Sequence, residues 1–180
     1  MIYVLYANGY SLAERQRQMS SNQKDELTMR EVTRENWRAT LRLAVHPEQQ
    51  RFIADTVPIA AIALAKAYIR PGGLLWLPYA FYAQSQMIGF TELAYEPGSA
   101  DTYWIFHFFI DRTYQGQGYG KKALLLLLDS VKQQHAHCRS IRLTVHPDNT
   151  QAQHLYTGAG FQPTGDTVEG EPIYQLIVRP

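Results

Sequence analysis

The sequence predicts an α/β (α+β) fold in which helices cover both faces of a mixed, mostly antiparallel sheet. Three observations carry this prediction. Residues 75–110 are rich in aromatic and β-branched residues and contain a short polar link that is typical of a hairpin. A long proline-free segment, Gly118–Gln134, then carries the leucine-rich block Leu124–Leu128. Because another strand-like segment, Ile141–Val145, follows it, we expect one locally parallel pair of strands.

The first part of the fold is expected to hold one strand and then three helices. These elements are Leu27–Val32, Trp37–Val45, Pro47–Ala54 and Ile59–Ile69. Thr33 and Asn36 stand three residues apart just before the first helix, in the manner of capping residues. Pro47 suits the first turn of the second helix. The third helix is alanine-rich, and Pro71-Gly72-Gly73 stops it.

The remaining elements are strands, the long helix and one shorter helix. The strands are Leu75–Tyr82, Met87–Ala94, Tyr103–Ile110, Ile141–Val145, Phe161–Thr164 and Ile173–Val178. Gln84-Ser85-Gln86 links the first two as a hairpin, and Pro97-Gly98 lies in the link to the third. The shorter helix is Thr150–Thr157, ended by Gly158. The unit formed by residues 103–145 has the order strand, helix, strand, which favours the parallel pairing.

One folded domain is expected. The chain has 180 residues, of which 46% are hydrophobic and 18% charged, as in ordinary globular proteins. Ser11–Asp25 is polar and lacks apolar periodicity, so we assign residues 1–28 to an N-terminal extension and residues 29–180 to the domain. Met19 and Met29 are both open as natural start residues.

Composition argues against several classes of partner. The formal net charge is +1, too small for a nucleic-acid or membrane footprint, and no apolar run approaches the roughly 20 residues of a membrane helix. The single cysteine, Cys138, excludes an internal disulfide and favours a reducing, cytoplasmic compartment. His146 has no second ligand at metal spacing, so no metal is expected.

The strongest motif is a glycine-rich turn between a strand and the long helix. It reads Gln115-Gly116-Gln117-Gly118-Tyr119-Gly120. Glycines allow a ligand to approach the backbone closely, and free N–H groups at a helix start attract anions such as a pyrophosphate. The spacing differs from the Gly-x-Gly-x-x-Gly of dinucleotide sites, and the Lys-Ser/Thr ending of a P-loop is missing. Lys121 and Lys122 either add charge to this site or form a solvated first turn.

This turn closely resembles the acyl-CoA pyrophosphate loop of the GNAT N-acetyltransferases. The segment 149–161 is similar to that family's Asn-x-x-Ala-x-x-Leu-Tyr-x-x-x-Gly-Phe pattern. The resemblance spans about Met29 to Val178. It implies the GNAT fold, with the parallel pair splayed at the cofactor site, and acetyl-CoA as the cosubstrate.

The resemblance also implies roles for particular residues. Ile110 offers backbone groups to the pantetheine arm, and Asn149 is either a helix cap, a cofactor contact or both. The residues expected to hold the pyrophosphate are Gln115, Gly116, Gly118, Tyr119 and Gly120. Tyr156 is expected to contact the cofactor and to act as the acid that protonates the departing thiolate.

Within the family, residues 30–37 and 45–52 look like the bacterial spermine and spermidine acetyltransferases. This similarity implies a polyamine acceptor, with Glu48, Trp37 and Phe52 as candidate substrate contacts. Aromatic walls and carboxylates suit a flexible polycation. Carboxylates that are simply solvated on a helix are the alternative for Glu48.

The general base is expected to be a carboxylate or a chain of water molecules, because an alkylammonium near its reference pKa of about 10.4 must lose a proton before it attacks. Glu92 is the candidate carboxylate, and an exposed strand carboxylate without a catalytic role is the alternative for it. Related polyamine enzymes often carry an acid on the strand at 103–110, and this strand has none. His107 is expected to be a satisfied buried histidine that faces away from Phe106 and Phe108.

The leading hypothesis is direct transfer from acetyl-CoA to a small-molecule primary amine, without an acyl-enzyme. Two alternatives are left open. The acceptor is a protein amine or an aminoglycoside, or the chain is an acyl-CoA-binding sensor that lacks activity. A homodimer is also left open.

Overall fold

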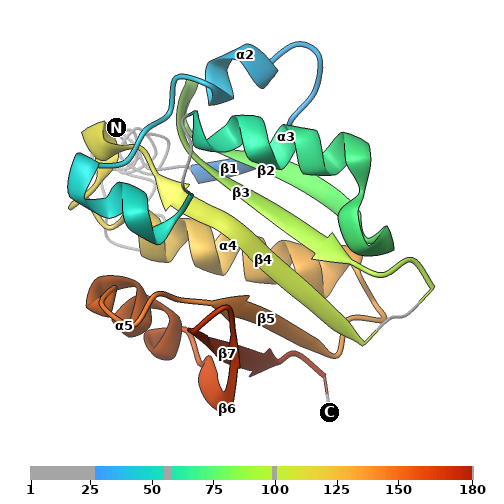
Figure 1. Cartoon of the computed structure of the whole chain (residues 1–180). Helices are drawn as coiled ribbons and strands as arrows, with labels where there is room; N and C mark the ends of the chain where they lie inside the picture. Colours follow the sequence, from blue (N-terminus) through green and yellow to red (C-terminus); the bar gives the residue numbers. More distant parts are fainter. Residues whose placement is uncertain (1–26, 55–57, 99–100, 180) are drawn as a thin grey trace, which may run out of the picture.

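A computed structural model describes residues 27–54, 58–98 and 101–179, so the N-terminal extension predicted at residues 1–28 lies almost wholly outside the described residues. Within these ranges one seven-stranded sheet has the order β1-β2-β3-β4-β5-β7-β6 (Figure 1). The strands are β1 Leu27–Glu31, β2 Leu75–Ala83, β3 Gln86–Tyr95, β4 Thr102–Ile110, β5 Ser140–Thr144, β6 Gln162–Val168 and β7 Glu171–Ile177. Only β4 and β5 pair in parallel; the other neighbours are antiparallel. The predicted mixed sheet with one parallel pair is therefore confirmed.

Helices cover both faces of the sheet, as predicted (Figure 1). They are α2 Trp37–Thr40, α3 Ile59–Ile69, α4 Tyr119–Gln134 and α5 Thr150–Gly158, with short 3-10 helices η1 Pro47–Phe52, η2 Pro71–Gly73 and η3 Arg112–Tyr114. One core forms where Leu124, Leu127 and Val131 of α4 pack on the sheet. A smaller core forms on the other face, where Ile59 and Ala63 of α3 pack against aromatic residues of β3 and β4.

The helix predicted at Trp37–Val45 is much shorter in the structure, because the backbone of Ala44 is used elsewhere. The Ala44 N–H donates to a carboxylate oxygen of Asp111 at 2.9 Å, and the Ala44 carbonyl accepts from the Arg112 N–H at 2.8 Å. These groups are unavailable to an α-helix, which ends at Thr40. The helix predicted from Pro47 to Ala54 is the shorter 3-10 helix η1. Both differences tie this segment to the loop after β4.

A bulge in β4 changes which side chains share a face. Between Phe106 and Phe109, β4 has His107 and Phe108 where β3 has only Thr91, and His107 adopts a φ of 49°. Phe106 therefore packs against Trp76 on the α3 face, its ring centroid 4.9 Å away. Phe108 instead contacts Phe81 and Tyr156 on the α4 face. The prediction that Phe106 and Phe108 share one face was wrong, because strict alternation holds only in an unbulged strand.

The parallel pair separates after three residues. Thr102, Tyr103 and Trp104 pair with Ser140, Ile141 and Arg142, and the pairing then stops. The rest of β4 pairs only with β3, whereas β5 pairs on along β7. A gap therefore opens between the carboxyl ends of β4 and β5, which is where open α/β sheets bind ligands.

The close approach of β3 and β4 beside this gap depends on Gly89. A Cβ atom at this position would lie 2.7 Å from the Phe109 carbonyl oxygen and 2.8 Å from Cδ1 of Ile110. Because the first of these is a backbone atom, Gly89→Ala must push the two strands apart. We expect it to lower the free energy of unfolding by about 2 kcal/mol, measured by urea denaturation.

Gly158→Ala is the matched control, since a Cβ atom there meets nothing within 4 Å and the residue ends α5. It should leave stability unchanged or raise it by about 0.5–1 kcal/mol. Equal stability of the two variants would contradict the close packing of β3 on β4.

Candidate active site

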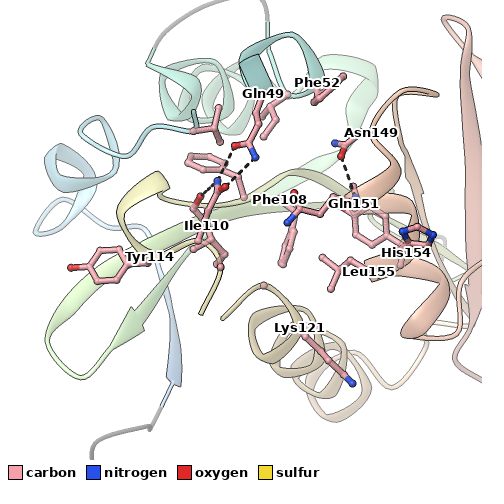
Figure 2. A pocket seen from close by; sticks show the side chains of 18 of the residues that line it. Gln49, Phe52, Phe108, Ile110, Tyr114, Lys121, Asn149, Gln151, His154 and Leu155 are labelled. Atoms are coloured by element: carbon pink, nitrogen blue, oxygen red, sulfur yellow. Dashed lines mark hydrogen bonds between the residues drawn. The ribbon is translucent and has the colours of Figure 1, made fainter. Parts of the chain in front are cut away.

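A cavity of about 450 Å³ lies in the gap where β4 and β5 separate (Figure 2). Its walls come from the end of β4, the glycine-rich loop, the first turn of α4, the helix α5 and the 3-10 helix η1. It is lined by eight residues that the sequence predicted for the site: Phe52, Ile110, Gln115, Gly116, Gly118, Gly120, Asn149 and Tyr156. The structure thus brings the two predicted motifs together around one cavity.

The glycine-rich loop presents its backbone to this cavity. Gly116 and Gly118 have φ angles of 74° and 79°, in the left-handed region that favours glycine. No atom lies within 4 Å of a Cβ built on either residue, so the space beside them is open. Gly118 is the N-cap of α4, and the N–H groups of the next turn have no partner within the helix. This geometry suits a pyrophosphate, and Lys121 lines the same cavity.

The side chain of Gln115 ties the loop to two other elements. Its Nε2 group donates to the carbonyl oxygen of Ile110 at 2.9 Å and to Oε1 of Gln49 at 3.0 Å. The Gln49 amide donates back to Oε1 of Gln115 at 3.0 Å. Figure 2 shows these bonds along one edge of the cavity. Gln49 was not predicted as a site residue.

Asn149 caps α5. Its side-chain oxygen accepts a hydrogen bond from the Ala152 N–H at 3.1 Å, so the capping role left open by the sequence is confirmed. Asn149 also lines the cavity, beside Gln151 and His154, which the sequence reasoning did not single out. Their position two and five residues after the cap was the available signal.

Tyr156 sits on α5 with its ring between Phe108 and Phe161, the centroids 6.4 Å and 5.9 Å away. Burial raises the pKa of the phenol well above its ordinary value, so the group keeps its proton at neutral pH. Among the described residues its hydroxyl has no hydrogen-bond partner, yet it is not one of the fully enclosed polar atoms. The hydroxyl is therefore a neutral donor that a bound molecule can meet.

The side of the cavity next to η1 is apolar. It is lined by Phe52 at the end of η1, by the next residue, Ile53, and by Phe108 and Phe109 of β4. These two β4 residues were not predicted as site residues, because the bulge at His107, which places Phe108 on the α4 face, leaves no pattern in an aromatic-rich strand. No aspartate or glutamate lines the cavity within residues 27–54, 58–98 and 101–179.

Four predicted site residues lie away from the lining: Glu92, Glu48, Trp37 and Tyr119. Tyr119 packs at the start of α4 with its ring 6.4 Å from that of Tyr114. Trp37 stacks with the guanidinium of Arg38, 4.6 Å from the ring centroid. Glu48 is exposed on η1. None of these four side chains lines the cavity in the structure.

Glu92 is fully buried under α3, and neither carboxylate oxygen has a hydrogen-bond partner. Burial raises the pKa of Glu92 to about 8, although attraction to the Lys66 ammonium opposes the shift. The alternation of β3 turns this side chain onto the α3 face while Leu93 enters the α4 core. Glu92 therefore cannot reach an amine in the cavity as the structure stands.

His107 is engaged on both ring nitrogens, which confirms its prediction as a satisfied histidine. Nδ1 lies 3.3 Å from the Ile53 carbonyl oxygen and Nε2 lies 3.4 Å from Nζ of Lys66. Burial and the Lys66 charge lower the pKa of His107 to about 4. The neutral ring therefore donates from Nδ1 to the carbonyl and accepts from Lys66 at Nε2.

His146 is held by structural contacts, as expected. Its Nδ1 accepts from the Asp148 N–H at 3.1 Å, and its ring lies 5.1 Å from that of Phe52. Across the described ranges, no three His, Cys, Asp or Glu side chains gather where they could hold a metal ion. Among those same residues, no helix combines the length and the apolar character needed to cross a membrane.

Comparisons with known proteins agree with this geometry. A model of the Acetyltransferase (GNAT) family matches residues 29–161. Over 145 residues the chain is 30% identical to the spermine/spermidine N(1)-acetyltransferase of Bacillus subtilis (strain 168), covering 78% of this chain and 90% of that protein. Both findings concern the sequence, and the family match includes both motifs.

Two solved structures share the fold at lower identity. Spermidine N-acetyltransferase from Vibrio cholerae, in complex with CoA and spermine, is 19% identical with a TM-score of 0.65 over 84% of this chain and 95% of that one. An acetyltransferase from Salmonella typhimurium that modifies the N-terminal serine of ribosomal protein L7/L12 is 17% identical, with a TM-score of 0.63 over 84% and 94%. At these identities the likeness extends to the fold alone.

The burial of Glu92 makes stability depend on pH. Folding raises its pKa, so below about pH 4.5 the folded and the unfolded chain both hold the proton, and the carboxyl does not lower the free energy of unfolding. Between about pH 5 and 8 the unfolded chain releases the proton while the folded chain keeps it, which favours unfolding by up to about 1.4 kcal/mol per pH unit. Glu92→Gln should remove this slope, so that the variant is a few kcal/mol more stable relative to wild type at pH 8 than at pH 5.

Urea denaturation at the two pH values measures this difference. Glu96→Gln makes the same chemical change at an exposed position and should leave the wild-type pH dependence intact. If Glu92→Gln and wild type differ by the same amount at both pH values, the carboxyl is not neutral in the folded chain.

Proposed function

As a member of the GNAT family of acetyltransferases, to which the match over residues 29–161 assigns it, the chain is an acetyl-CoA-dependent N-acetyltransferase, and we propose that its acceptor is a primary amine of a polyamine such as spermine or spermidine. One observation carries the proposed chemistry. The neutral phenol of Tyr156 and the glycine-rich start of α4 face the same cavity at the open end of β4.

The residues present fit acetyl-CoA. The open backbone at Gly116 and Gly118, with the first N–H groups of α4 and the nearby Lys121, supplies positive potential for a pyrophosphate. Ile110, at the end of β4, lies where the pantetheine arm would pass. When bound, the cosubstrate supplies an activated acetyl thioester. Tyr156 then donates a proton or hydrogen bond as the thiolate leaves.

Transfer is proposed to be direct, without an acyl-enzyme. Cys138 is the only cysteine of the chain, and it is fully buried in the core beyond the end of α4, outside the cavity lining. Burial raises the pKa of this thiol to about 11, so the thiolate that attack requires is scarce. The amine itself is therefore the nucleophile.

The proton of the amine is proposed to leave through water. Glu92 is enclosed under α3, and no carboxylate lines the cavity in the described part of the chain. Of the two routes that the sequence left open, a water chain is the one these positions favour. Water molecules in the cavity would accept the proton of the amine and pass it to the solvent.

The polyamine assignment draws on the curated relative and on the apolar wall. The relative is named a spermine/spermidine acetyltransferase at 30% identity. Phe52, Phe108 and Phe109 offer surfaces suited to a methylene chain and to cation–π contact. Glu48, exposed on η1 one residue before Gln49, is proposed to attract a distal ammonium.

A monoamine or a peptide amine is the second candidate acceptor. The described lining has no carboxylate to pair with the extra cations of a polyamine. A monoamine needs no such partner once its single nitrogen is neutral. The two candidates therefore differ in the number of positively charged groups that the site must bind.

Release of free CoA, followed with a thiol reagent, tests the acceptor. The panel contains spermine, spermidine, n-butylamine, a short peptide with a free N-terminus and an aminoglycoside. We expect kcat/KM for spermine or spermidine to exceed that for n-butylamine by about tenfold or more, the size of one extra charged contact. A preference for n-butylamine or the peptide would transfer the assignment to the second candidate.

Tyr156→Phe tests the acid. Removing the hydroxyl should lower kcat by about 10²–10⁴-fold and leave acetyl-CoA affinity nearly unchanged, because the ring and its packing remain. Tyr174→Phe removes a hydroxyl from another buried tyrosine that does not line the cavity, and it should keep wild-type kcat. An unchanged kcat in Tyr156→Phe, with chemistry rate-limiting, would show that another group protonates the thiolate.

A further inference from the structure

The 3-10 helix η1 crosses the mouth of the gap between β4 and β5. At its start, Gln49 forms the reciprocal amide pair with Gln115 of the loop after β4. At its end, Phe52 packs on His146 and Arg51 lies 3.3 Å from Asp148, both beyond the end of β5. The helix therefore contacts the loops that follow both of the separating strands. Figure 2 shows the hydrogen bonds of Gln49 at the first of these contacts.

η1 has no fully buried residue of its own. Its position therefore depends on side-chain contacts at its two ends more than on packing into a core. The Arg51–Asp148 pair is exposed on both sides, so it contributes little. The amide pair at the other end is half-buried and holds two hydrogen bonds of 3.0 Å.

Each amide group of this pair also forms a hydrogen bond to the backbone of its own segment. Oε1 of Gln49 accepts a further bond from the His46 N–H at 3.2 Å, at the N-cap of η1. Nε2 of Gln115 uses its second hydrogen on the Ile110 carbonyl oxygen at 2.9 Å. One continuous chain of hydrogen bonds therefore runs from the start of η1 through both glutamines to the end of β4.

The two glutamines connect opposite sides of the cavity. Gln115 directly precedes Gly116, at the start of the loop that suits a pyrophosphate. Gln49 lies on the same short helix as Phe52, which faces the apolar side together with Ile53. The amide pair therefore links the start of the glycine-rich loop directly to the helix that carries Phe52.

We propose that Gln49 is a positioning residue that couples acetyl-CoA binding to amine binding, an inference that rests on the function proposed above. Anion contacts order the exposed loop at Gly116 and Gly118 and so fix Gln115. Gln115 holds Gln49, and Gln49 holds η1 with Phe52 against the acceptor. By linkage, the amine must tighten CoA binding by the same factor.

The experiment measures spermine affinity by calorimetry with and without saturating CoA, which forms a ternary complex that cannot react. In wild type we expect CoA to tighten spermine binding by about fivefold or more, within the usual range of coupling between sites. In Gln49→Leu the factor should fall below about two, while CoA affinity alone changes by less than about threefold, since Gln115 keeps its hydrogen bond to the Ile110 carbonyl oxygen. Gln133→Leu makes the same change at an exposed position on α4 and should keep the wild-type factor.

A double-mutant cycle separates coupling from general loosening. Because the two amides act as one unit, Gln49→Leu combined with Gln115→Leu should lose no more coupling than either single variant. Gln49→Glu keeps the acceptor oxygen but loses the donor to Gln115, so it should retain part of the factor and provides a second variant if Gln49→Leu folds poorly. Equal coupling factors in wild type and Gln49→Leu, or a wild type without coupling, would overturn the proposal.

A failed acceptor assignment gives a different result. If the panel shows preference for n-butylamine or the peptide, that amine replaces spermine as the probe, and the same comparison of coupling factors decides the role of Gln49. The amine preference of the wild-type enzyme thus tests the polyamine assignment. The difference in coupling factor between wild type and Gln49→Leu tests the role of Gln49.

Discussion

The early end of the pairing between β4 and β5 is the constraint on which the rest of the site depends. Three residues of each strand pair, and the strands then separate. The unpaired edge of β4 would be an exposed row of backbone groups if nothing filled the gap. The glycine-rich loop, α5 and η1 surround this edge, and the cavity is the space that they leave. The cavity therefore lies against an edge of β4 that no strand covers.

The bulge at His107 determines how that edge is presented. It gives β4 one residue more than β3, and it turns Phe108 toward Tyr156 while Phe109 stays on the α3 face. The unusual backbone of His107 is held by the contacts of its ring with the Ile53 carbonyl and Lys66. The contact with Ile53 also holds the residue that follows η1, so the bulge and η1 stabilise each other.

Much of the fold could be predicted because local patterns coincide with global structure. The helix Ile59–Ile69 and the start of α4 at Gly118 follow from alanine content, proline and glycine positions, and the structure has both where they were expected. The end of α2 could not be predicted, because it depends on the hydrogen bond between Ala44 and Asp111, which stand 67 residues apart in the chain. The glycine loop and Tyr156 were found through motifs. Gln49 was visible only within a family pattern, since an amide pair between distant loops leaves no periodicity in the sequence.

The burial of Cys138 has a practical and a chemical consequence. A thiol without exposed surface and with a raised pKa reacts slowly with disulfides, peroxides and alkylating agents. A colorimetric thiol reagent should therefore count released CoA with little contribution from the folded protein. For the same reason, the slow appearance of a reactive thiol would report directly on opening of the core.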